Sequence, residues 1–172
     1  MAVTVTFVRG VSPDEVIRRL GANPSAGTEM LHSDVWETQG QGYEFHLGVQ
    51  VDVVDAWTVI VEPNGWMLTS PGTAERVSVG GELVSLYWNV NALMQFIAAR
   101  DGTLIRRFDP LLYKQQSIGR PLPEEADLPF GHPGDPRGAA IQLAERLTGV
   151  RLTRDWLLND RHPTWTGFPM PR

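Results

Sequence analysis

The sequence predicts an α+β fold in which a largely antiparallel sheet of about five to six strands carries an N-terminal helix and C-terminal helices. Segments with strand-like alternation dominate the middle of the chain, whereas helical periodicity is confined to its two ends. Tight-turn signals separate neighbouring strand segments, which is typical of antiparallel hairpins. A length of 172 residues favours one domain. We expect it to span residues 1–158, with an extended C-terminal tail at 159–172.

The chain opens with a strand and a helix. Residues 3–8 alternate and are β-branched, which predicts a strand. Ser12 is the expected N-cap of a helix with Pro13 at its first position, and Glu15 is expected to complete a capping box. Gly21 is the expected C-cap of this helix.

The next segments are a loop and two strands. Residues 22–42 show little periodicity and are expected to be irregular. Alternation predicts strands at 43–54, with a bulge at Gly48, and at 56–62. A turn at 63–65 follows, because Pro presets φ and Asn-Gly tolerates positive φ.

The middle of the chain continues the sheet. Ser70-Pro71 predicts a short helix within 70–79. Strands are expected at 82–90, 93–99 and 103–108. Asp101-Gly102 is a strong hairpin signal between the last two.

The C-terminal part is expected to be a surface loop followed by helices. Residues 114–138 are rich in Pro and Gly, which predicts the loop. Residues 138–148 form the clearest helix, ending at Gly149, and Thr153 caps a second, short helix. The buried side of the longer helix is expected to carry Ala140, Ile141, Ala144 and Leu147.

Composition and charge narrow the function. The net charge of −5 argues against a nucleic-acid partner, because such proteins usually carry a basic stripe. The arginine pairs at 18–19 and 106–107 are expected on solvated faces. The absence of cysteine excludes disulfides and thiolate chemistry. Without a signal-peptide or membrane-spanning pattern, we expect a soluble, cytoplasmic protein with no membrane partner.

Signatures of catalysis and of cofactor binding are missing from the sequence. It contains no GxSxG, GxxxxGK[ST], GxGxxG or HExxH pattern. The four histidines, His32, His46, His132 and His162, match no compact spacing of metal ligands. We therefore expect no metal and no cofactor, and an enzymatic function is not favoured.

One candidate binding region surrounds the turn at 63–65. Glu62 lies at a strand end, where it accepts a hydrogen bond from the turn or pairs with an arginine, or else meets Asp52 and Asp55 in an acid–base site. Asn64 lies in the turn itself. Trp66 either caps the open end of the core or is an exposed anchor for a partner.

A second candidate region is the end of the strand at 82–90. Asn89 and Asn91 flank Val90, and asparagine is depleted in strands. They either stabilise a bend through local backbone hydrogen bonds or form a polar recognition patch with Tyr87 and Glu62.

Several motifs together resemble a family of uncharacterised actinobacterial domains. They are FVRGVSPDEVIRRLGA, VEPNGW, VSLYWNVNA, the DG hairpin with FDP, and LAERLTGVRLTRDWL, and they cover most of the chain in order. The resemblance implies no activity, ligand or catalytic residue. By association only, small acidic domains of this kind include interaction proteins, among them immunity proteins against toxins.

Two functions follow as hypotheses. The first is a non-enzymatic protein-binding domain, such as an immunity-type antagonist of a toxin, whose acidic charge steers it to a basic partner surface. The alternative is a small-molecule-binding domain or an unrecognised enzyme, with a pocket near Glu62, Asn89 and Asn91. A pocket of a few hundred Å³ would favour the alternative, and a flat face with exposed aromatic side chains would favour protein binding.

Overall fold

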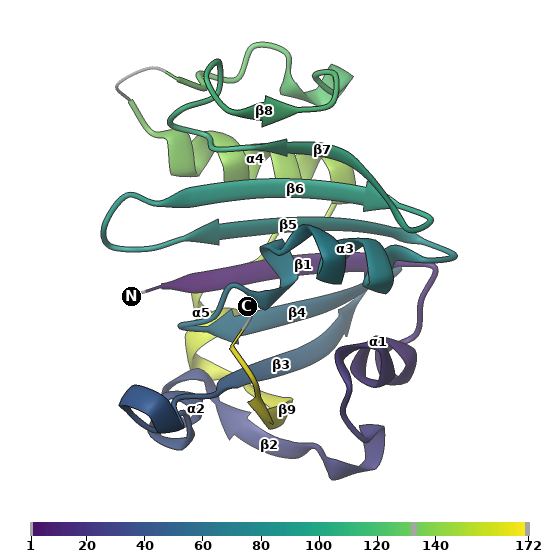
Figure 1. The fold of residues 1–172 in the computed structure, drawn as a ribbon, viewed down its shortest axis with the longest axis vertical. Coiled ribbons are helices and arrows are strands. Elements are labelled where there is room, and N and C mark those ends of the chain that lie inside the picture. The colour runs from purple at the N-terminus through teal and green to yellow at the C-terminus, as the bar shows by residue number, and fades with distance from the viewer. Residues whose placement is uncertain (1, 132–133, 171–172) are drawn as a thin grey trace.

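A computed structural model describes residues 2–131 and 134–170. Within them, nine strands form one antiparallel sheet in the order β2-β9-β3-β4-β1-β5-β6-β7-β8 (Figure 1). The strands are β1 (Val3–Arg9), β2 (Thr28–Leu31), β3 (Leu47–Val54), β4 (Trp57–Pro63), β5 (Glu82–Trp88), β6 (Met94–Arg100), β7 (Thr103–Phe108), β8 (Ser117–Ile118) and β9 (Arg161–Phe168). The helices are α1 (Pro13–Leu20), α2 (His32–Thr38), α3 (Pro71–Ser78), α4 (Pro136–Thr148) and α5 (Arg154–Asn159). Four 3₁₀ turns are η1 (Pro24–Ala26), η2 (Gly42–Glu44), η3 (Met67–Thr69) and η4 (Pro123–Glu125).

Strand β1 is the centre of the sheet. It pairs with β4 on one side and with β5 on the other, so that Thr4 lies opposite both Glu62 and Tyr87. All but the last of its residues are buried. Thr4 and Thr6 alternate with its apolar residues, and burial of these two is tolerated because their hydroxyls bond the Gly65 carbonyl and the Ser85 hydroxyl.

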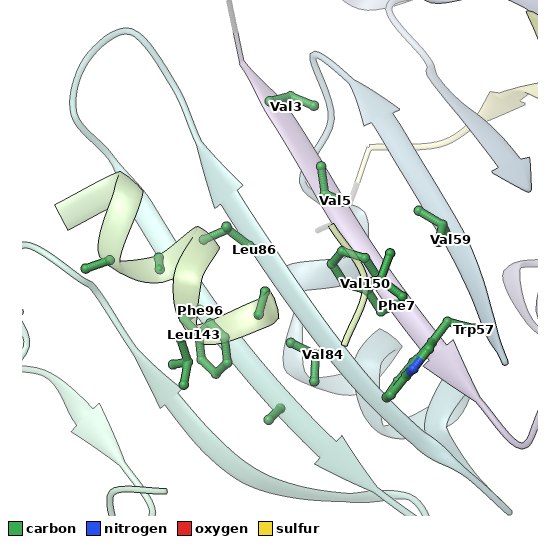
Figure 2. Close-up of a cluster of buried hydrophobic side chains, with 14 of the residues drawn as sticks. Val3, Val5, Phe7, Trp57, Val59, Val84, Leu86, Phe96, Leu143 and Val150 are labelled. Carbon is green, nitrogen blue, oxygen red and sulfur yellow. The ribbon is translucent and has the colours of Figure 1, made fainter. Parts of the chain in front are cut away.

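Helices cover both faces of the sheet, which gives three layers (Figure 1). Alternate residues of each central strand point to opposite faces. One face carries Val5, Phe7 and Leu86, which pack with helix α4 (Figure 2). Trp156 of α5 packs against the same cluster. The other face carries Val8, Ile60, Leu83 and their neighbours, which pack with α1, α3 and η3. Burying both faces is what allows so wide a sheet to stand in one domain.

Local signals predicted most elements between residues 3 and 108. Ser12 accepts a hydrogen bond from the backbone N–H of Glu15, and Gly21 ends α1 in the left-handed region. The capping-box role expected for Glu15 is wrong, because its carboxylate binds Arg18 and Arg19 instead. The bulge at Gly48 is confirmed as a register shift.

The expected count of five to six strands is too low. Strand β2 and helix α2 lie in the segment 22–42 that was expected to be irregular, and β8 lies in the expected loop 114–138. These strands are short, so alternation is hard to recognise in them. Strand β9 occupies most of the segment expected as a tail, where it lies between β2 and β3.

Two further expectations about side-chain burial are corrected. In α4 the buried residues are Ala139, Ala140, Leu143 and Ala144, whereas Ile141 is 37% exposed and Leu147 is only partly buried. The buried side of α4 is rotated by about one residue from the expected one, so that its small alanines face the sheet, and the helix begins at Pro136, two residues earlier than expected. Arg106, expected on a solvated face, is almost completely buried.

Candidate functional site

The turn after β4 is organised by the buried carboxylate of Glu62. Its two oxygens accept hydrogen bonds from the backbone N–H groups of Met67 (2.7 Å) and Leu68 (2.9 Å). Glu62 is 0% exposed, and no described residue forms an ion pair with it. Burial therefore raises the pKa of this carboxyl to about 7, against the two hydrogen bonds, which lower it.

The remaining residues of this turn shape the backbone or take part in backbone hydrogen bonds. Asn64 adopts a left-handed φ of 53°, and its N–H donates to the carbonyl of Ala2. The Thr4 hydroxyl donates to the carbonyl of Gly65 at 2.7 Å. A Cβ at position 65 would lie 2.9 Å from the Cβ of Glu62, so the close approach requires glycine. Trp66 is half-buried at the start of η3, where its carbonyl accepts from Thr69.

The hairpin between β5 and β6 is organised by Asn89. Its side-chain oxygen accepts from the backbone N–H groups of Asn91 (2.9 Å) and Leu93 (3.1 Å), and its amide nitrogen donates to the Tyr87 hydroxyl (2.9 Å). The backbone of Ala92 is left-handed, at φ 58°. The Asn89 side chain therefore fixes the turn, because it binds the backbone of the turn through its oxygen and the Tyr87 side chain through its nitrogen.

The tip of this hairpin carries exposed apolar side chains. Val90 is 77% exposed and Leu93 is 58% exposed. Asn91 and Ala92 between them are also exposed, and none of the residues from 89 to 93 is charged. The hairpin therefore presents two apolar side chains to solvent on a turn that hydrogen bonds hold in place.

A hollow of about 550 Å³ lies beside the tip. The Arg107 guanidinium at its wall lies against the side-chain amide of Gln95. Its lining mixes polar and apolar groups, from Tyr87, Leu93, Met94, Gln95, Arg107, Phe108, Asp109, Gln115, Gln116, Ser117 and Ile118.

The six residues singled out from the sequence fall into two clusters. Glu62, Asn64 and Trp66 surround one turn, and Tyr87, Asn89 and Asn91 build the β5–β6 hairpin. Glu62 and Tyr87 share a cross-strand row, separated by Thr4 on β1. Of the six, only Tyr87 lines the 550 Å³ hollow.

The carboxylates considered for an acid–base site do not converge. Asp52 pairs with Val59 across β3 and β4, three residues along the strand from Glu62, which corresponds to roughly 10 Å. Asp52 instead contacts His162, whose Nδ1 lies 3.0 Å from its Oδ2. Nε2 of His162 lies 2.9 Å from the Trp156 carbonyl. Through these two contacts His162 connects β9 to β3 and to α5.

A second histidine lies at the same edge of the sheet. His32 is buried, and neither of its ring nitrogens has a hydrogen-bond partner among the described residues. Burial lowers the pKa of this imidazole, the Gln50 side chain works against that effect, and the nearby His162 adds to it. His46 is half-buried against the Glu44 carbonyl, and His132 lies outside the described residues. Among the residues described, no three His, Asp or Glu side chains are placed to share a metal ion.

A buried ion pair was missed by the sequence reasoning. Arg106 binds Glu125 through two hydrogen bonds of 2.7 and 2.9 Å, and the Tyr113 hydroxyl donates to the same carboxylate at 2.6 Å. Burial opposes ionisation of Glu125, yet the bonds from Arg106, the Leu122 N–H and Tyr113 hold its pKa below the ordinary value. The pair fastens the loop that follows β7 to the sheet. The signal was the alternation in β7, which puts Arg106 on the same face as the buried Phe108.

The helices of the described chain are too short or too polar to cross a bilayer.

Comparisons with known proteins give a family and no function. Searches of curated proteins and of solved structures find no match to this chain. A family model of unknown function, DUF6461, matches residues 1–164. The chain therefore belongs to the DUF6461 family of unknown function.

Proposed function

We propose that this chain is a non-enzymatic protein-binding domain that docks its partner through the tip of the β5–β6 hairpin. The observation that carries the proposal is the exposed pair Val90 and Leu93 on a turn fixed by Asn89. A turn that is already ordered loses little conformational entropy on binding, which favours affinity. Exposed apolar side chains that gather in one place often mark an interaction site.

The surroundings of the tip support a partner of protein size. The adjacent hollow is of mixed polarity, as interfaces between proteins commonly are. Ile118, which lines the hollow, is also exposed, and so are Leu111 and Leu112, which follow the lining residue Asp109 in the chain. We call the hairpin tip, the hollow and the segment 109–118 together the docking surface.

The charge of the whole chain indicates what kind of partner would be favoured. A net charge of −5 attracts a basic protein and raises the rate of encounter. A toxin with a basic surface is such a partner, and the chain would then act as its cytoplasmic, immunity-type antagonist in an actinobacterial host.

Affinity capture from the native host tests the proposal. The wild-type chain should retain one stoichiometric protein, identified by mass spectrometry. The double variant Val90→Ser/Leu93→Ser should lose it, because truncating interface anchors typically costs 2 kcal/mol or more, roughly thirtyfold in affinity. The unfolding free energy of this variant should stay within about 0.5 kcal/mol of the wild-type value, since both side chains are exposed.

Val53→Ser is the matched control. Val53 is also an exposed apolar residue of the sheet, with 54% of its surface exposed. It pairs with Thr58 near the turn between β3 and β4, at the end of the sheet away from the β5–β6 hairpin. This variant should retain the partner. Equal retention by all three proteins would contradict docking at the hairpin, and failure of the wild type to retain any stoichiometric protein would contradict the function itself.

A further inference from the structure

We infer that the cavity between the sheet and helices α4 and α5 is a binding site for a small monocyclic aromatic carboxylate. The cavity measures about 190 Å³. Its floor consists of Val5 and Phe7 of β1 and Leu86 of β5 (Figure 2). Leu86 and Tyr87 point to opposite faces, so this site and the hollow beside the hairpin are distinct.

The size and lining of the cavity select the apolar part of the ligand. Almost all of its surface is carbon, with Trp88 and Leu157 among the walls. Ala144 of α4 faces the space and is too short to fill it. Protein interiors are otherwise close-packed, and an apolar cavity of about 150 Å³ is known to stay dry and accept benzene. A volume of 190 Å³ therefore fits one aromatic ring with a short substituent.

The rim of the cavity selects the charge of the ligand. Arg154 and Glu145 both lie on it. Glu145 already has a cation within reach, since its Oε1 lies 3.9 Å from Nε of Arg151. Arg154 has no ion pair among the described residues, so its guanidinium is free to bind an anion. An aromatic ring in the cavity with a carboxylate at Arg154 satisfies both features, because a guanidinium binds a carboxylate through paired hydrogen bonds.

Titration of the intact chain with phenylacetate, followed by NMR, tests the site. The methyl signals of Leu86, Val150 and Leu157 should shift in a saturable way, with a Kd on the order of 0.1–1 mM for a ligand of this size. Phenylacetamide, which has the same shape and no charge, should bind roughly two- to fivefold more weakly, as expected for the loss of one exposed ion pair.

Three variants locate the binding. Arg154→Gln should abolish the preference for phenylacetate over phenylacetamide, whereas Arg137→Gln, an exposed arginine of α4 outside the cavity, should retain it. Ala144→Leu should abolish binding of both compounds by filling the cavity. Ile141→Phe narrows the mouth at an exposed position and should weaken both even if Ala144→Leu does not fold.

The outcomes separate this site from the protein-binding function. Val90→Ser/Leu93→Ser should bind phenylacetate as wild type does. Absence of any saturable shift in the wild type would overturn the site, as would binding that survives both Ala144→Leu and Ile141→Phe. Equal affinity for phenylacetate and phenylacetamide would overturn the carboxylate class, leaving a neutral aromatic group, such as a partner's side chain, as the occupant.

Discussion

Glu62 holds a carboxylate where solvent does not reach, with two backbone N–H groups as its only described partners. Its charged form is therefore disfavoured in the folded chain, and its pKa is about 7 instead of the ordinary 4.5. In the unfolded chain the same group ionises near 4.5. The folded state thus binds the proton more tightly than the unfolded state, and the stability from this difference is present below pH 4.5 and lost as the pH rises through 7.

The first prediction uses the variant Glu62→Gln, which does not titrate. Between about pH 5 and about pH 8, the unfolding free energy of wild type should fall relative to that of the variant by up to about 3 kcal/mol. Urea denaturation at several pH values measures this difference. A difference that stays constant over the range would show that Glu62 is ionised with its ordinary pKa in the folded protein.

Arg106 illustrates what residue identity alone does not reveal. An arginine in a strand is expected to face solvent, and only a partner that satisfies it makes burial tolerable. That partner, Glu125, is 19 residues away in a loop without periodicity. The guanidinium also donates to the carbonyls of Ile118 and Gly119 and lies over the rings of Phe108 and Tyr113. No local pattern encodes contacts of this range.

At the scale of elements, the turn of the β5–β6 hairpin depends on the side chain of Asn89. Asn89→Ala removes the acceptor of two backbone N–H groups and should lower the unfolding free energy by about 1–2 kcal/mol. It should also weaken partner capture, because Val90 and Leu93 then belong to a mobile turn. Thermal melting and affinity capture measure the two effects.

Asn89→Asp is the control for this hairpin. A carboxylate accepts from the same two N–H groups but cannot donate to the Tyr87 hydroxyl. It should keep most of the stability and most of the captured partner. If Asn89→Ala captured as much partner as wild type, the fixed turn would be irrelevant to binding.

Strand β9 completes the sheet from the far end of the sequence. It lies between β2 and β3, and His162 fixes it through Asp52 and the Trp156 carbonyl. Pro163 made this strand hard to recognise in the sequence, because proline is usually excluded from interior strands. Its Thr164 and Trp165 pair with β3, a contact more than 110 residues away in the chain that alternation cannot predict.

Truncation after Asp160 tests the role of β9. It should expose the edge of β3, detach β2 and destabilise the chain enough to broaden or abolish cooperative unfolding. Circular dichroism during heating and light scattering measure unfolding and aggregation. A truncated chain that melts as sharply and at the same temperature as wild type would show that β9 is dispensable.

For the whole molecule, the features that the sequence predicted are those determined by interactions between residues close together in the chain. Capping by Ser12, the turns at Asn64 and Asp101-Gly102, and the alternation of β4 depend on neighbouring residues and were predicted. Strands β2 and β9 depend on distant parts of the chain and were not predicted, and β8, which pairs with the nearby β7, is only two residues long. In the hairpin proposed as the docking site, Asn89 and Asn91 stood out in the sequence because asparagine is depleted in strands, but Val90 and Leu93 did not, because exposure follows only from the fold.

Amide hydrogen exchange of the intact chain, with and without its captured partner, tests the docking surface most directly. The partner should slow exchange at residues 89–95 and 109–118 and leave the β2 edge and helix α2 unchanged, because only the tip and its hollow are covered. Protection confined to β2, α2 or the α4–α5 side, with none at the hairpin, would contradict the account.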